Sequence, residues 1–165
     1  KTIDNDVAMT DVTFGFDTAM TTAAEAIDRL HTTADSHHRV IIVEVMGHDV
    51  GWLALGAGIA GGADVILLPE LPYRIESVVD SLLNRYRNGK RFSIVAIAEG
   101  SLSVEEHEAI KGGDADVEAA CESSSAAVRL SGRIKDAINL DTRVTVLGHL
   151  QRGGSPTSRH SQRRI

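Results

Sequence analysis

Two carboxylates lie close together at the start of the sequence. The stretch KTIDND places Asp4 and Asp6 two positions apart, just before a predicted amphipathic helix. One such carboxylate can act as a general base, while the second tunes its pKa or faces a metal ion. Aspartate is also common where a helix begins, because the helix dipole favours negative charge there. The spacing alone leaves both interpretations open.

The stretch GHLQRGG, residues 148–154, is a second candidate site. It places His149 and Arg152 three positions apart and follows them with two glycines. Arginine carries a fixed charge on a planar donor fork that suits phosphate, and histidine adds donors from a second direction. Glycine lets a backbone approach an anion closely. The alternative is an ordinary surface loop, but we expect a phosphate-binding turn.

Four more charged residues have two interpretations each. Glu44 lies inside an apolar stretch, as a buried structural acid or an edge residue would. Glu99 precedes Gly100 at the end of a stretch, where a carboxylate either accepts hydrogen bonds from sugar hydroxyls or simply begins a turn. Arg39 and Arg143 begin predicted strands. They are either solvent-exposed arginines or residues that bind a ligand of another copy of the chain in a symmetric oligomer.

Helical and strand-like patterns alternate along the chain and must position these residues. Apolar spacing predicts helices over about 14–32, 51–63, 75–86 and 117–138. Apolar, β-branched runs predict strands at 39–47, 64–70, 92–100 and 142–154, the last running into the glycine loop. This alternation is typical of a parallel α/β sheet, which binds ligands beyond the carboxyl ends of its strands. The polar groups expected at that edge are Met46-Gly47-His48, Glu70, Glu99-Gly100 and residues 149–154.

The composition limits the class of protein. A chain of 165 residues with 42% hydrophobic and 24% charged residues suits one globular domain. Its net charge of −6 argues against a general nucleic-acid or membrane-surface partner. The single cysteine, Cys121, excludes an internal disulfide and fits a reducing cytoplasm. The histidines outside the GHLQRGG stretch follow no metal-ligand spacing, so no histidine metal site is predicted.

Four stretches, KTIDND, RVIIVEVMG, IAEG and TVLGHLQRGGSP, together resemble the 6-phosphofructokinase family. The resemblance runs from Lys1 to about Pro156. It implies an α/β fold, an incomplete parallel-sheet three-layer sandwich of phosphofructokinase type. Residues 1–156 would form the catalytic and sugar-phosphate-binding part, and residues 157–165 a divergent basic tail. Such enzymes are cytoplasmic, allosteric and usually tetrameric or dimeric, and they transfer a phosphoryl group to the 1-hydroxyl of fructose 6-phosphate in glycolysis, with Mg²⁺ as cofactor.

The resemblance also implies roles for individual residues. Asp4 is similar to the catalytic base, Thr2 to the residue that holds the transferred phosphoryl group, and Asp6 to a supporting acid. The implied substrate-binding residues are Arg39, Met46, Gly47, His48, Glu99, Arg143, His149 and Arg152. Among these, Arg39 and Arg143 resemble the pair that reaches a neighbouring subunit's sugar phosphate. The reaction would be an in-line phosphoryl transfer, which depends mainly on positioning and charge stabilisation.

The sequence departs from the family in three places. Family members commonly have arginine where this chain has His48, which is mostly neutral near pH 7. They carry a donor-phosphate loop and a metal-binding acid before TIDND, and neither occurs here. After GGSP this chain reads TSRHSQRRI, where the family continues differently. We therefore expect an internal fragment that is inactive alone.

The sequence leaves two alternatives for the phosphoryl donor and two for the activity. Lys1 is typical of pyrophosphate-using members and also occurs in some ATP-using ones, so we favour ATP, bound through the absent segment, with pyrophosphate as the alternative. A non-catalytic sugar-phosphate-binding paralogue or a truncated remnant is the alternative to a kinase.

Overall fold

The computed structural model describes residues 3–138 and 140–158, so the predicted roles of Lys1 and Thr2 lie outside the described residues. The elements are α1 (Phe16–His37), β1 (Val40–Val45), α2 (Trp52–Ala60), β2 (Val65–Leu67), α3 (Ile75–Arg87), β3 (Ser93–Ala98), α4 (Val104–Lys111), α5 (Ala115–Ser123), α6 (Ala126–Ala137), β4 (Thr142–Val146) and the 3₁₀ turn η1 (Gly148–Arg152).

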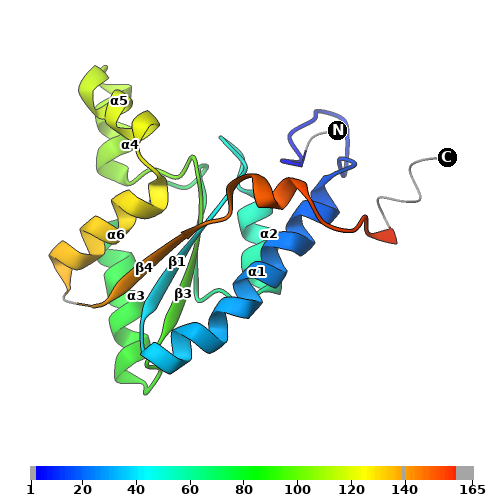
Figure 1. The fold of residues 1–165 in the computed structure, drawn as a ribbon. Helices are drawn as coiled ribbons and strands as arrows, with labels where there is room; N and C mark the ends of the chain where they lie inside the picture. The colour runs from blue at the N-terminus through cyan, green and yellow to red at the C-terminus, as the bar shows by residue number, and fades with distance from the viewer. Residues whose placement is uncertain (1–2, 139, 159–165) are drawn as a thin grey trace.

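The four strands form one parallel sheet in the order β2-β3-β1-β4 (Figure 1). Helices α1 and α2 cover one face, and α3 and α6 cover the other. All four strands therefore end at the same edge, which is the upper edge in Figure 1. The predicted three-layer α/β sandwich is confirmed.

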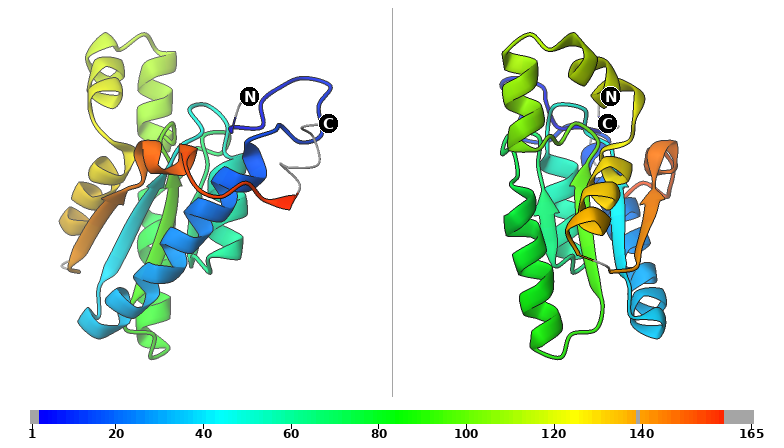
Figure 2. Two further views of the ribbon diagram at one scale, coloured as in Figure 1. Left: turned by 45° about the vertical axis from the view of Figure 1, so that its right-hand side comes forward. Right: turned by 90° about the vertical axis from the view of Figure 1, so that its left-hand side faces the viewer.

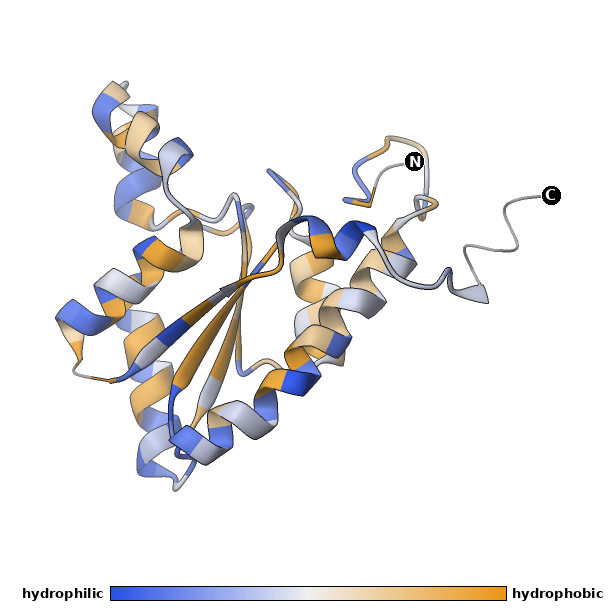
Figure 3. Ribbon diagram, in the orientation of Figure 1, coloured by the Kyte–Doolittle hydropathy of each residue, from blue (hydrophilic) through white to orange (hydrophobic). Residues whose placement is uncertain are grey.

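The two central strands explain why the sequence folds this way. Every residue of β1 and β3 is buried, because helices cover both of their faces. Figure 3 shows these strands as hydrophobic along most of their length, while the helices carry one apolar and one polar side. One half of the core packs around Ile27 of α1 and Leu53 of α2, and the other around Leu82 of α3 and Leu130 of α6.

Several predicted boundaries were wrong. The predicted helix at 117–138 is two helices, because Ser124 is extended, with φ −124°, and Ser125 starts α6 by accepting a hydrogen bond from the Val128 N–H. Helix α4 was not predicted, although Ser103 and Glu106 form a capping box at its start. Strand β2 covers only Val65–Leu67 of the predicted 64–70.

Helices α4 and α5 form a helical arm, residues 104–123, that stands beyond the carboxyl ends of the strands (Figures 1 and 2). The described part of α5 contains no buried residue, and α4 buries only Glu106. Residues 3–15 lie at the same end of the sheet, on the side of α1 and α2. The arm and the N-terminal segment thus flank the edge where the predicted site residues gather.

Candidate functional site

The turn Met46-Gly47-His48 follows the central strand β1 and is backbone-constrained. Gly47 has φ +148° and His48 has φ +49°, a conformation that side chains disfavour. A Cβ on Gly47 would lie 2.3 Å from the carbonyl oxygen of Val50, so only glycine fits. A Cβ on Gly100 would lie 2.0 Å from the carbonyl oxygen of His48. The turn therefore packs directly on the backbone that follows β3.

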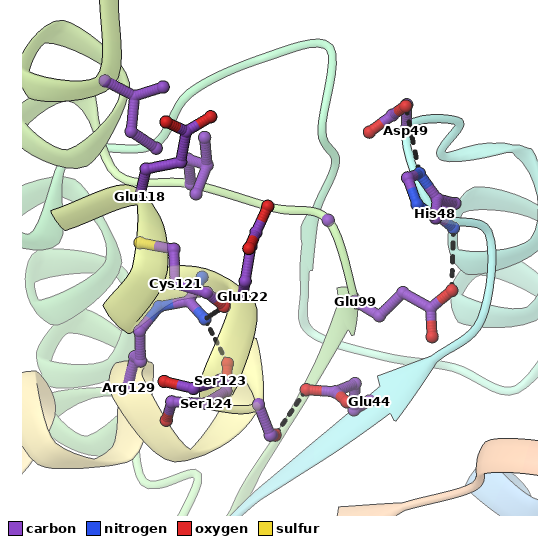
Figure 4. Close-up of a pocket in the computed structure, with 14 residues that line it drawn as sticks. Glu44, His48, Asp49, Glu99, Glu118, Cys121, Glu122, Ser123, Ser124 and Arg129 are labelled. Carbon is purple, nitrogen blue, oxygen red and sulfur yellow. Dashed lines mark hydrogen bonds and ion pairs between the residues drawn. The ribbon is translucent and has the colours of Figure 1, made fainter. Parts of the chain in front are cut away.

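Glu99 holds this turn with one of its carboxylate oxygens. Its Oε1 accepts hydrogen bonds from the Gly47 N–H at 3.3 Å and the His48 N–H at 2.9 Å. Figure 4 shows the Glu99 side chain reaching toward His48 from the end of β3. Glu99 is thus more than a strand-end residue, because it fixes the turn that the sequence assigns to the sugar site.

Of the two interpretations of Glu44, the structure supports the buried structural acid. It is 7% exposed, in the central strand β1. Its Oε2 accepts hydrogen bonds from the Ser125 hydroxyl at 2.5 Å and from the Ala127 N–H at 2.9 Å. A carboxylate at this place satisfies free N–H groups at the start of α6 and suits the helix dipole.

A cavity of about 470 Å³ opens between the strand ends and the helical arm (Figure 4). On one side it is lined by His48, Asp49 and Glu99, and on the other by Glu118 and Glu122 of α5. Its lining also includes Glu44 and the cation Arg129. Carboxylates outnumber cations among the described lining residues, so this space suits hydroxyl groups better than phosphate.

The guanidinium N–H groups of Arg129 donate hydrogen bonds to partners beneath the cavity. Its guanidinium donates to Glu106 Oε1 at 3.1 Å, to the carbonyl oxygens of Cys121 and Ser124, and to that of Ser101 at 3.2 Å. It joins the arm to α6 and to the end of β3. Burial raises the pKa of the Cys121 thiol, so the thiol that lines the cavity stays protonated at neutral pH.

His149 and Arg152 lie in η1, which follows β4, rather than in the predicted extension of the strand. Both side chains are exposed, and neither residue is among the described residues that line the cavity. Gly154 has a packing role: its φ is +101°, and a Cβ there would lie 2.8 Å from Thr22 Oγ1 on α1. The turn thus rests against α1 while presenting its cations outward.

Arg39 and Arg143 lie together at the edge of the sheet opposite to the strand ends. Both contact the carboxylate of Asp141, with Arg143 Nη1 at 2.6 Å from Oδ1 and Arg39 Nε at 2.5 Å from Oδ2. Val40 and Thr142 pair in the parallel register, which places the two arginines on neighbouring strands. Strand β4, with five residues and a length of about 17 Å, leads from this edge to η1. The two cation pairs of one chain therefore face different ends of the sheet.

Asp4 and Asp6 belong to the N-terminal segment at the carboxyl edge of the sheet (Figure 2). Asp4 is half-buried and Asp6 is exposed. The adjacent Asn5 has φ +61°, and its Oδ1 accepts a hydrogen bond from the Thr13 N–H at 2.8 Å, which closes the segment into a loop. Asp4 precedes this loop and Asp6 lies within it, and neither is part of the helix start at Phe16.

Sequence reasoning missed two residues that organise this edge. Gln151, between His149 and Arg152, has no charge that would mark it as a site residue, yet it is 1% exposed and bonded to its surroundings. Arg129 carried no sequence signal, because a lone arginine in a helix is usually solvent-exposed. Among the described residues, no group of three or more His, Cys, Asp or Glu side chains is arranged to hold a metal ion. No helix in the described ranges has the length and apolar character of a membrane span.

Sequence comparisons agree with the fold. A family model for phosphofructokinase matches residues 1–163. An ATP-dependent 6-phosphofructokinase of Spirochaeta thermophila is 52% identical over 157 residues, which cover 95% of this chain and 43% of that protein. One from Propionibacterium freudenreichii is 48% identical, covering 96% of this chain and 47% of that protein. The chain thus spans less than half the length of these curated relatives.

Solved structures give the same result. Phosphofructokinase from Saccharomyces cerevisiae matches with a TM-score of 0.80 at 33% identity, over 98% of this chain and 20% of that one. A pyrophosphate-dependent phosphofructokinase from Marinobacter aquaeolei matches with a TM-score of 0.75 at 25% identity, over 98% of this chain and 40% of that one. With the strand-end turns, the family model and these relatives in agreement, the chain belongs to the phosphofructokinase family.

Proposed function

We propose that this chain provides the sugar-phosphate-binding part of an ATP-dependent 6-phosphofructokinase. The observation that carries the proposal is the juxtaposition of two turns at one sheet edge. The Met46–His48 turn is held by Glu99, and the neighbouring η1 carries His149 and Arg152. In the proposed complex the first turn binds the sugar and η1 binds the 6-phosphate of fructose 6-phosphate.

The chemistry in this proposal is an in-line phosphoryl transfer. Asp4 accepts the proton of the attacking 1-hydroxyl, Asp6 supports Asp4, and Thr2 holds the transferred group. Glu99 keeps Oε2 for a sugar hydroxyl while Oε1 stays on the turn. Such a reaction needs mainly positioning and stabilisation of charge. Constrained turns suit this task, because they do not have to reorganise when the substrate binds.

The donor is proposed to be ATP because the curated relatives are named ATP-dependent. Pyrophosphate is the second candidate, favoured by the match to the Marinobacter aquaeolei enzyme. Mg²⁺ would neutralise the donor phosphates when bound. The described residues do not assemble a ligand set for it.

The proposed oligomer follows from Arg39 and Arg143. These side chains lie at the amino edge of the sheet, away from η1 of their own chain. We propose that a second copy places its sugar phosphate beside them, and that this phosphate competes with Asp141 for both guanidinium groups. Asp141 then serves as the partner that keeps the pair together when no phosphate is bound.

The test is thermal unfolding of the 165-residue chain with and without fructose 6-phosphate. A ligand at ~100 times its Kd stabilises a fold by about 2.7 kcal/mol, which is a shift of several degrees. Arg152→Ala should abolish the shift, while Leu150→Ala, in the same turn, should keep it. A cooperative transition that does not respond to the sugar phosphate would refute the proposal.

His48 separates a kinase from a non-catalytic paralogue. Its side chain is exposed and contacts Asp49, with Nδ1 3.0 Å from Oδ2. Arginine at this position would add the permanent cation that the family commonly has. If the missing cation makes the chain slow or inactive, His48→Arg should raise the rate of phosphoryl transfer when the rest of the enzyme is present. No gain in activity would count against this role of His48.

A further inference from the structure

The Met46–His48 turn is held from both neighbouring strands. Strand β1 lies between β3 and β4 in the sheet. From the β3 side, Glu99 accepts the N–H groups of Gly47 and His48. From the β4 side, Gln151 Oε1 accepts the Met46 N–H at 3.4 Å. Three consecutive backbone donors are therefore bound by two side chains.

Gln151 also holds its own turn. Its Nε2 donates to the carbonyl oxygen of Gly148 at 3.2 Å, and Gly148 has φ +48° at the start of η1. The side chain is 1% exposed, whereas its neighbour Leu150 is 75% exposed. One buried amide thus links the turn after β1 with the turn after β4. His149 and Arg152 lie on either side of it in the sequence.

We propose that Gln151 is a positioning residue that sets the distance between the sugar-binding turn and the phosphate-binding turn. The inference rests on the proposed function, since it concerns a ligand that contacts both turns. Gln151 has no contact with such a ligand in this role. It acts by fixing Met46 relative to η1 before the ligand arrives, and that fixed geometry lowers the entropic cost of binding.

Glutamine suits this role because it is both donor and acceptor. The Met46 N–H needs an acceptor, and the Gly148 carbonyl needs a donor. An ionised glutamate offers acceptors only, and methionine offers neither at similar size. Gln151→Met therefore removes both bonds and leaves a part-buried N–H and a part-buried carbonyl without this partner. Gln151→Glu keeps the bond to Met46 and loses the bond to Gly148.

The experiment compares two ligands by calorimetry on variants that are folded at the working temperature. In the proposed complex fructose 6-phosphate contacts both turns, whereas inorganic phosphate contacts the cations at η1, including those from a second copy, and not the sugar-binding turn. For Gln151→Met we expect affinity for fructose 6-phosphate to fall about tenfold and that for phosphate to change less than about twofold. Leu150→Ala is the matched control and should change neither affinity.

Amide hydrogen exchange without ligand gives the second readout. In Gln151→Met, the Met46 amide should exchange at least about tenfold faster than in the parent chain, beyond any change in the slowest core amides. An equal loss of affinity for both ligands, or an unchanged exchange rate of the Met46 amide, would overturn the positioning role. Absence of fructose 6-phosphate binding by the parent chain would refute the proposed function, and exchange at Met46 would then show only whether Gln151 holds the turn.

Discussion

The two sides of the cavity are built in different ways. On the strand side, the backbone N–H groups of Gly47 and His48 are bound by Glu99, and the turn packs against Gly100. On the arm side, the described part of α5 has no buried residue, and Arg129 ties its last turn to the body. A binding site that must select one ligand needs the first kind of support. The second kind permits opening and local motion.

The largest contrast is expected from one substitution made on each side. Gly47→Ala places a Cβ 2.3 Å from a backbone oxygen at φ +148°, so we expect a loss of about 4 kcal/mol of folding free energy. Gly113→Ala, between α4 and α5, also has a positive φ of +84° but meets nothing within 4 Å. It should cost only ~1 kcal/mol. Urea unfolding of both variants measures the difference, and equal losses would contradict the contrast.

Arg129 is the exception on the arm side, because its side chain is only 12% exposed. Arg129→Met leaves Glu106, which is 6% exposed, with Arg133 as its remaining cation at 3.2 Å. We expect a loss of about 3 kcal/mol, since breaking a buried ion pair leaves an undercompensated charge. Arg129→Lys should not restore stability, because lysine cannot reproduce the guanidinium geometry.

The double variant Glu106→Gln, Arg129→Met provides the control for this assignment. It also removes the Glu106 charge that Arg129→Met leaves undercompensated, so it should be more stable than Arg129→Met alone. If Arg129→Met proved as stable as the parent chain, the arm would be held by contacts other than this guanidinium.

Tyr73 lies at the base of the arm, where its N–H donates to Leu102 and its carbonyl accepts from the Val104 N–H. Burial, followed by the nearby Glu106 carboxylate, raises the pKa of Tyr73 to about 12. The raised folded-state pKa gives stability that is present below pH 10 and is lost as pH rises from 10 toward 12. A shift of about two units corresponds to roughly 2–3 kcal/mol.

Unfolding at pH 9 and pH 11 tests this dependence. The parent chain should lose more stability between these pH values than Tyr73→Phe, because phenylalanine has no phenol to ionise. An identical loss in both proteins would assign the alkaline effect to other groups.

The sequence was a good guide on the strand side and a poor one on the arm side. Continuous apolar runs predicted β1 and β3, and the parallel arrangement placed their polar ends at one edge as expected. Helix α4 was missed because its start depends on a capping box, Ser103 with Glu106, rather than on apolar periodicity. Gln151 was missed because charged side chains are the sequence signal for a binding site. A buried amide carries no charge and acts through two modest hydrogen bonds.

The smallest predicted effect compares two helix caps. Ser125 caps α6 and also donates to Glu44, and α6 buries Leu130 and Ile134 in the core. Ser125→Ala should therefore lower global stability by about 1 kcal/mol in urea unfolding. Asp114 caps α5 by accepting from the Val117 N–H at 3.2 Å, but α5 buries nothing in its described residues.

Asp114→Ala should leave the global unfolding free energy within ~0.5 kcal/mol of the parent chain and accelerate hydrogen exchange only in α5. The reason is that a cap adds to global stability only when unfolding of its helix also exposes core. If Asp114→Ala destabilised the whole chain as much as Ser125→Ala, α5 would unfold together with the core. The arm would then be part of the rigid framework, and the difference between the two sides of the cavity would lie in packing alone.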